Sequence, residues 1–235
     1  MLNSLRKIRS KLLEEGNLKK YLAYAVGEII IVVVGILLAL YLNNWNQKRT
    51  NDKLEIQYYQ SMKNQLNEDL NAISGEIDYN QTYLNQFSYA KRLILLNDKS
   101  KTDTLGKIVR NMVKFSDFRR KSNVYQTLLN SGEIIIIKNH KITDRLQRLE
   151  ENYNYINRLE DNHTTIIMSQ IIPDMRQIIQ FDPLKVETPA ILFSYKFQNN
   201  FDMLIVLMIE KMDAYKQAND EIKYTIGLID QELKD

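Results

Sequence analysis

"YAVGEIIIVVVGILLALYL", residues 24–42, is apolar except for one acid, Glu28. The surrounding segment from Tyr21 to Leu42 has the length that an α-helix needs to cross a bilayer, since its rise of about 33 Å is close to the thickness of the hydrocarbon core. The sequence therefore predicts one membrane-spanning helix.

A cleaved signal peptide is the competing interpretation of this segment. Its apolar core would span about 7–15 residues and would be followed by small residues at a cleavage site. Here the apolar run is longer and ends in Tyr41-Leu42-Asn43-Asn44-Trp45. This favours an uncleaved signal anchor over residues 17–46, with Tyr21 and Trp45 as anchors at the two membrane interfaces.

Charge is distributed unevenly along the chain. Residues 1–20 contain six basic and two acidic side chains, whereas residues 43–235 contain 26 of each. The neutral downstream part argues against nucleic-acid binding, which needs a basic face on the folded domain. The six bases before the span outnumber the three just after it, Lys48, Arg49 and Lys53. This asymmetry predicts a cytoplasmic N-terminus.

Residues 1–16 have the pattern of a short amphipathic basic helix. Apolar residues recur at intervals of three and four, with Arg6, Lys7, Arg9 and Lys11 between them. We expect this helix to lie along the anionic inner leaflet of the bilayer, with these four side chains as interfacial anchors. The alternative is that the basic residues act only as topology signals.

The predicted span carries small residues on one face. The stripe repeats every four positions and consists of Ala23, Gly27, Ile31, Gly35 and Ala39, with Ile31 as a bulky interruption. Small residues let two helix backbones approach closely within lipid. The stripe therefore predicts a homo-oligomer, although glycine and alanine are also common in single spans.

Glu28 lies at the edge of this stripe, in the cytoplasmic half of the span. A charged acid at the bilayer centre is costly, but bending toward the headgroups lowers the cost at this depth. We expect Glu28 to have an interhelical or interfacial partner, such as Lys19 or Lys20. A polar ring in an oligomeric pore is the alternative.

The stretch from Leu5 to Arg49 resembles a known N-terminal signature. Its most telling parts are the basic residues of the head, Gly27-Glu28-Ile29, Gly35-Ile36-Leu37 and Asn43-Asn44-Trp45-Asn46. They are similar to those of a family of small Bacteroidota membrane proteins that is catalogued as a domain of unknown function. The resemblance implies a bacterial inner-membrane protein with a helical periplasmic part, and it implies no activity.

Downstream of the span, apolar residues recur at helical spacing. The pattern predicts long helices over residues 54–94, 141–180 and 193–233, with one or two shorter helices within 105–131 that end at Gly132. Asn80 and Lys91 occupy polar positions in the first apolar seam. The membrane helix is expected to continue directly into the 54–94 helix. The predicted fold is all-α, an elongated antiparallel helical bundle over residues 47–235.

Two segments interrupt this helical pattern. Residues 134–137 are four isoleucines, a run that fits either a buried strand or a buried helical turn. We interpret it as a short apolar connector packed in the core. Pro173 is expected to kink or interrupt the third long helix, and residues 181–189, with two prolines, are expected to form a loop.

Residues that could perform chemistry are few. Glu160 and His163 share a helix face at the spacing of carboxylate-bridged metal sites, but such sites need the pair twice plus two further glutamates. The chain has no cysteine, phosphate-binding loop or nucleophile elbow. We therefore expect no catalytic residue, metal or cofactor, and no enzyme. The basic run 119–121 is expected to be solvated, with an anionic partner as the alternative.

Three functional classes fit this sequence. The leading one is a membrane-anchored scaffold or accessory subunit that oligomerises or docks on an envelope protein partner. The second is a periplasmic ligand sensor, which would need a separate output protein because about 20 cytoplasmic residues hold no output domain. The third is an oligomeric channel, which rests on the stripe and Glu28 alone.

Overall fold

The computed structural model describes residues 18–234, and its contacts divide the chain into two units between Leu54 and Glu55. Helix α2 (Leu18–Leu95) starts in the first unit and continues without a break into the second, as predicted. Within the first unit the apolar segment from Leu22 to Leu42 contains no buried residue. The predicted amphipathic helix over residues 1–16 lies outside the described residues.

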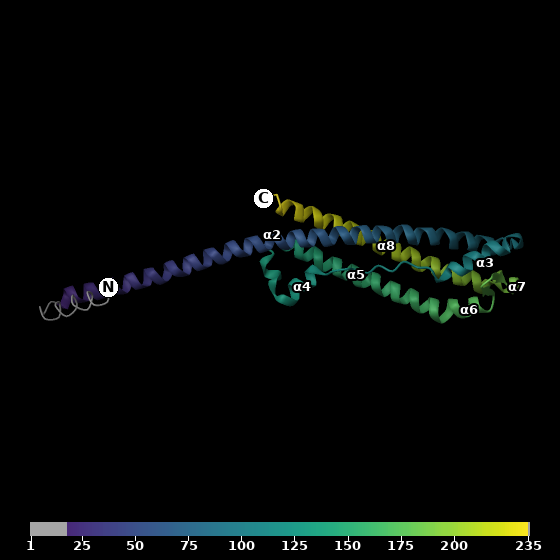
Figure 1. Ribbon diagram of the computed structural model, residues 1–235, viewed down its shortest axis with the longest axis horizontal. Helices are drawn as coiled ribbons and strands as arrows, with labels where there is room; N and C mark the ends of the chain where they lie inside the picture. Colours follow the sequence, from purple (N-terminus) through teal and green to yellow (C-terminus); the bar gives the residue numbers. More distant parts are fainter. Residues whose placement is uncertain (1–17, 235) are drawn as a thin grey trace. The chain divides into compact units, whose positions relative to one another are not determined.

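The second unit, from Glu55 onward, is a helical bundle with one small hairpin. Its long helices are the rest of α2, α5 (His140–Ile166) and α8 (Tyr195–Glu232), as Figure 1 shows. The shorter helices are α3 (Thr102–Arg110), α4 (Val124–Ser131), α6 (Ile172–Arg176) and α7 (Pro189–Leu192). This confirms the predicted all-α bundle.

Ion pairs fix the direction in which α8 runs along α2. Lys63 pairs with Asp230 and Lys91 pairs with Asp202, each at 2.5 Å, so rising numbers on α2 meet falling numbers on α8. The two helices are therefore antiparallel. Lys91 is one of the polar positions in the predicted seam. Its side chain is half-exposed and forms the ion pair with Asp202.

Helix α5 runs in the same direction as α2. Tyr153 donates a hydrogen bond to Asp69 at 3.0 Å, and the backbone N–H of Lys138, just before α5, donates to Glu55 at 2.7 Å. Both pairs are separated by nearly the same number of residues, which is the pattern of parallel neighbours. Helix α8 is antiparallel to both, and it packs extensively against α5.

Two parallel helices need a return path for the chain between them. Residues 114–123 supply it as an irregular segment, here called the strap, which runs back along the bundle between α3 and α4 (Figure 1). Asn123 then caps α4, because its side chain accepts the N–H of Gln126 at 2.9 Å. Gly132 ends α4 in the left-handed conformation, with φ +73°, as its position in the sequence predicts.

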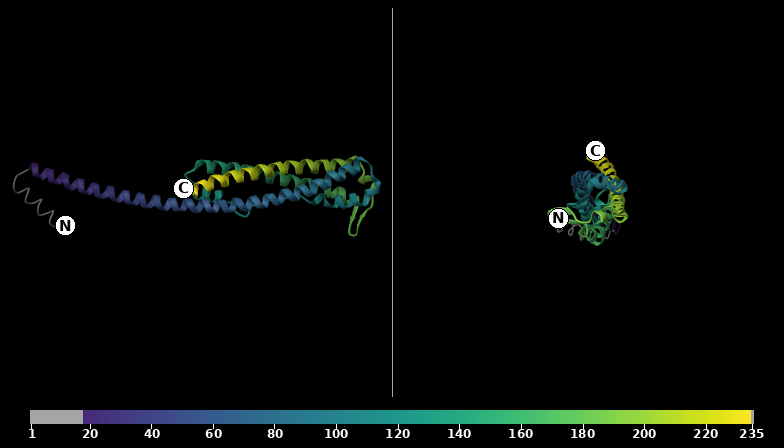
Figure 2. Two further views of the ribbon diagram at one scale, coloured as in Figure 1. Left: turned by 90° about the horizontal axis from the view of Figure 1, so that it is seen from above. Right: turned by 90° about the vertical axis from the view of Figure 1, so that its right-hand side faces the viewer.

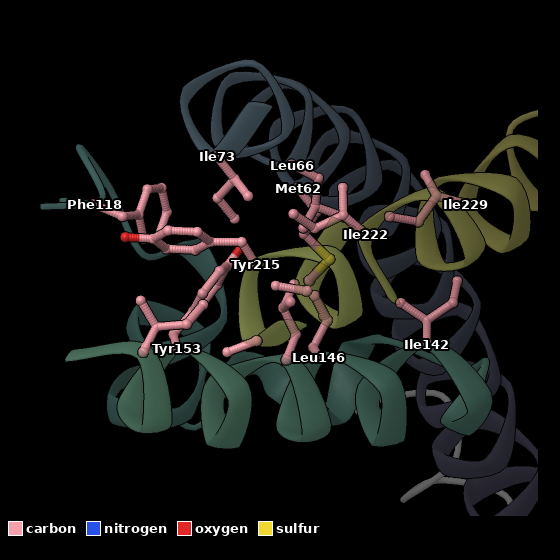
Figure 3. Packing of buried hydrophobic residues seen from close by; sticks show 14 of the residues in the cluster. Met62, Leu66, Ile73, Phe118, Ile142, Leu146, Tyr153, Tyr215, Ile222 and Ile229 are labelled. Atoms are coloured by element: carbon pink, nitrogen blue, oxygen red, sulfur yellow. The ribbon is translucent and has the colours of Figure 1, made fainter. Parts of the chain in front are cut away.

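The core consists of two apolar clusters. The first joins the early part of the bundle portion of α2, most of α5 and the second half of α8, and Figure 3 shows Met62, Leu66, Leu146, Tyr215 and Ile222 within it. The second joins the end of α2, α3, the π-helical turn Ile167–Ile171 and the first half of α8. The seams predicted from helical spacing therefore supply most of this core.

A two-stranded hairpin was missed by the sequence reasoning. Strand β1 (Ile179–Phe181) pairs antiparallel with β2 (Leu184–Val186), inside the segment that was expected to be the end of a helix and a loop. The hairpin packs on α3, at the end of the bundle where α6 and α7 lie (Figure 2). Pairs of three-residue strands are too short to show an alternating pattern in sequence.

The structure confirms the expectation for one of the two irregular segments and differs from it for the other. The π-helical turn Ile167–Ile171 precedes Pro173, so the predicted interruption of the third long helix is confirmed. Residues 133–136 form a 3₁₀ turn rather than a fully buried connector. Ile137 is buried but Ile135 is 85% exposed, because a tight turn directs neighbouring side chains to opposite sides.

Candidate functional site

The strap has no helix or strand ladder to satisfy its backbone polar groups. Buried N–H and C=O groups need hydrogen-bond partners, and side chains of the helices provide them. The N–H of Phe118 donates to Glu160 at 2.8 Å, and the N–H of Asp117 donates to Glu76 at 3.2 Å. The ammonium of Lys211 donates to the carbonyl of Ser116 at 3.0 Å.

The first and third of these contacts belong to a buried polar layer, which consists of Asn80, Ser116, Glu160, His163 and Lys211. Each of the five is less than 5% exposed. None of them belongs to either apolar cluster, and α2, α5, α8 and the strap all contribute. Asn80, the polar seam position noted in the sequence, donates to the carbonyl of Met208 at 2.7 Å. Much of the layer thus holds the strap against the helices.

Glu160 is the main acceptor of this layer. Its Oε1 atom accepts both the Phe118 N–H and the hydroxyl of Tyr215, the latter at 2.5 Å. Burial raises the pKa of Glu160, opposed by these two hydrogen bonds and by the charge of Lys211. Burial beside Glu160 also raises the pKa of Tyr215, so the phenol keeps its proton and remains the donor.

Lys211 is a fully buried amine on the α8 side of the layer. Its Nζ lies 5.3 Å from the centre of the Phe115 ring, a cation–π arrangement. Burial lowers the pKa of Lys211 to about 8, against the opposing effect of Glu160, Glu76 and Asp117. The amine therefore stays mostly protonated at neutral pH.

His163 is the member of the layer whose side chain forms no hydrogen bond with the described residues. Its side chain is fully buried, its ring stacks on Phe115 with centroids 5.1 Å apart, and neither ring nitrogen has a hydrogen-bond partner among the described residues. Burial and the positive charge of Lys211 lower its pKa to about 3. Within residues 18–234, no group of three or more metal-binding side chains includes it.

A surface pocket of about 830 Å³ lies between the strap and α5. The α5 wall is formed by Asn157, Glu160, Asp161 and Thr164. The strap wall is formed by residues 117–123 and Phe115. Glu160 thus faces both the buried layer and this pocket.

The basic run 119–121 divides between the pocket and the core. Arg120 forms a two-pronged ion pair with Glu150, and its guanidinium lies 4.4 Å from the centre of the Tyr153 ring. Arg119 and Lys121 are exposed, and Arg119 pairs with Asp117 at 3.0 Å. The expectation of a solvated basic corner therefore holds for two of the three side chains.

The predicted membrane residues lie along α2 in the first unit. Ala23, Ile31, Gly35 and Ala39 are exposed and Gly27 is half-buried. Beyond the helix's own backbone, a Cβ added at either glycine would meet no atom of the described residues within 4 Å. Glu28 and Trp45 are exposed, and Tyr21 lies near the start of the helix. Arg6, Lys7, Arg9 and Lys11 lie outside the described residues.

The sequence reasoning missed the strap, the pocket and the role of Lys211. A signal for Lys211 was present, because this lysine falls between Met208 and Tyr215 on the buried face of α8. A lysine on the buried face of a helix predicts a buried polar contact, because a buried charge needs a partner. Ser116 had no such signal, since the strap has no periodicity.

Comparison with known proteins identifies the family. Residues 28–169 match a family of unknown function (DUF6090), and because this match covers more than half of the chain, the protein belongs to that family. No curated protein and no solved structure matches the chain. The matched segment contains most of the apolar segment, the strap and the α5 wall of the pocket.

Proposed function

We propose that this member of the DUF6090 family is a single-pass protein of a bacterial inner membrane whose helical bundle acts as a scaffold or accessory subunit. The proposal rests on one observation. Helix α2 begins as an exposed apolar segment and continues without a break as one of the long helices of the bundle. By length and composition α2 qualifies to cross a membrane, and its most apolar stretch is not buried against any described part of the chain. The proposed role is docking rather than catalysis.

The proposed topology places the N-terminus in the cytoplasm and the bundle in the periplasm. It is supported by the excess of basic residues before the span. The chain has no cysteine, so single cysteines can be introduced and labelled without background. We expect Asn199→Cys, at an exposed position of α8, to react with a membrane-impermeant maleimide in intact spheroplasts. Asn3→Cys should react only after the membrane is permeabilised, and the opposite pattern would refute the topology.

The docking role is tested by crosslinking mass spectrometry on native membranes, with the full-length chain as bait. Reproducible crosslinks from the bundle to a second envelope protein would support an accessory subunit. Crosslinks between copies of this chain would support a scaffold built by self-association. A bundle that crosslinks only within its own chain would refute both forms of the proposal.

Ligand sensing is a second candidate function, and the pocket beside the strap favours it. Its volume lies within the range of about 300–1,000 Å³ that is typical of small-molecule sites. It also borders a buried polar layer that fixes the path of the strap. A ligand that contacts both walls would therefore change how firmly the strap is held.

A further inference from the structure

We propose that the pocket between the strap and α5 binds a short peptide with both termini free. This proposal deepens the sensing function and does not depend on docking. It rests on the net charges of the two walls, because the α5 wall carries two acids whereas the strap wall carries three bases and one acid, Asp117. Asp161 and Lys121 have no ion-pair partner among the described residues. The peptide's ammonium group would lie at the α5 wall and its carboxylate at the strap wall.

The α5 wall offers acceptors for a cationic group. The Glu160 carboxylate accepts two hydrogen bonds, both at Oε1. Its Oε2 atom accepts none from the described residues. Asp161 follows it on the same wall, is exposed, and its carboxylate has no ion-pair partner among the described residues. The amide of Asn157 lies one helical turn away and adds a further polar group. An ammonium group with three N–H donors suits this arrangement.

The strap wall offers donors for an anionic group. Lys121 is exposed on the pocket and has no ion-pair partner in the described part of the chain. Arg119 is held only by Asp117, two residues away, in an exposed pair of the kind that contributes little energy. Arg120 is excluded from ligand binding because its guanidinium is occupied by Glu150 and Tyr153.

Ligands with one sign of charge fit this pocket poorly. A simple anion would meet the carboxylates of Glu160 and Asp161, and a simple cation would meet Arg119 and Lys121. Two charges separated along one molecule match both walls. A tripeptide spans about 10 Å when extended, and its backbone can hydrogen-bond to the Asn157 amide on the α5 wall.

Isothermal titration calorimetry tests this proposal on the full-length chain in lipid nanodiscs. The probes are trialanine, N-acetyl-trialanine and trialanine amide. We expect trialanine to bind, and each blocked terminus to weaken binding at least about tenfold, the effect of losing a charge-assisted hydrogen bond. Absence of binding at concentrations that would reveal a millimolar Kd overturns the proposal. Equal binding of the blocked peptides also overturns it.

Two exposed variants assign the ends of the peptide. Asp161→Asn should abolish the preference for a free N-terminus, and Lys121→Gln should abolish the preference for a free C-terminus. The matched controls are Asp220→Asn and Lys216→Gln, which remove the same charges from exposed positions of α8. Equal effects of controls and pocket variants would overturn the assignment. The crosslinking experiment remains a separate test of docking, so the two proposals can fail independently.

Discussion

At the scale of single residues, His163 makes the stability of the bundle depend on pH. Its pKa is lowered to about 3 by burial and by Lys211, against about 6.5 in the unfolded chain. A base with a lowered folded-state pKa contributes its full stability above pH 6.5, and that contribution is lost as the pH falls toward 3. The loss reaches about 2 kcal/mol near pH 5. Glu160 opposes this trend because its raised pKa favours the protonated form at low pH.

We therefore predict that His163→Phe reduces the acid sensitivity of the protein. Phenylalanine keeps an aromatic ring against Phe115 but has no proton to gain. The thermal unfolding midpoint of the variant, followed by circular dichroism, should fall less than that of the native protein between about pH 8 and pH 5. His140→Gln is the matched control, because His140 is exposed. Parallel pH profiles for His163→Phe and the native protein would contradict the prediction.

Gly106 lies where the surrounding structure leaves no room for a side chain. A Cβ at this position would lie 2.5 Å from Cγ2 of Val186, so α3 contacts the hairpin through a bare backbone. We predict that Gly106→Ala destabilises the protein by about 1–3 kcal/mol. Adding Val186→Ala should recover part of the loss, because it removes the clashing methyl group. Thermal unfolding followed by circular dichroism measures each effect. Gly75→Ala, with open space around its Cβ among the described residues, should be neutral or stabilising in this assay.

At the scale of elements, the strap depends on side chains rather than on its own structure. We predict that Glu160→Leu leaves the Phe118 N–H and the Tyr215 hydroxyl without an acceptor, at a cost of about 2–5 kcal/mol. Hydrogen–deuterium exchange should then accelerate in residues 114–123 before it accelerates in α8. Asp161→Asn, at the neighbouring exposed position, should leave the exchange unchanged. Uniform acceleration across the bundle would show that the carboxylate supports the whole core instead.

The elements also show which parts of the fold could be predicted from sequence. Helices α5 and α8 could be predicted, because the apolar residues that form each buried face recur every three or four positions along the local sequence. The strap and hairpin β1–β2 depend on partners far along the chain, such as Glu160 for Phe118. The sequence showed Asn80 as a polar position in the apolar seam. Its acceptor, the Met208 carbonyl, lies 128 residues away along the chain, so the local sequence could not predict this hydrogen bond.

At the scale of the whole molecule, the small-residue stripe of the span predicts self-association in lipid. Gly27 and Gly35 have open space around them, so nothing in residues 18–234 requires a glycine at either position. Close approach of a second helix does require small residues there. The prediction that copies of this protein associate through the stripe therefore concerns the apolar segment of α2 alone and needs no contribution from the bundle.

Gly27→Leu combined with Gly35→Leu should shift the protein toward monomers, because two bulky side chains separate the helix backbones. Single-molecule photobleaching of the labelled full-length chain in bilayers would count the copies per complex. Val26→Leu combined with Val33→Leu places two leucines on exposed positions of the opposite helix face, and should leave the count unchanged. If the glycine variant and the native protein give the same count, association does not use this face. Any oligomer would then have to form through another part of the chain, such as a different face of α2 or the bundle.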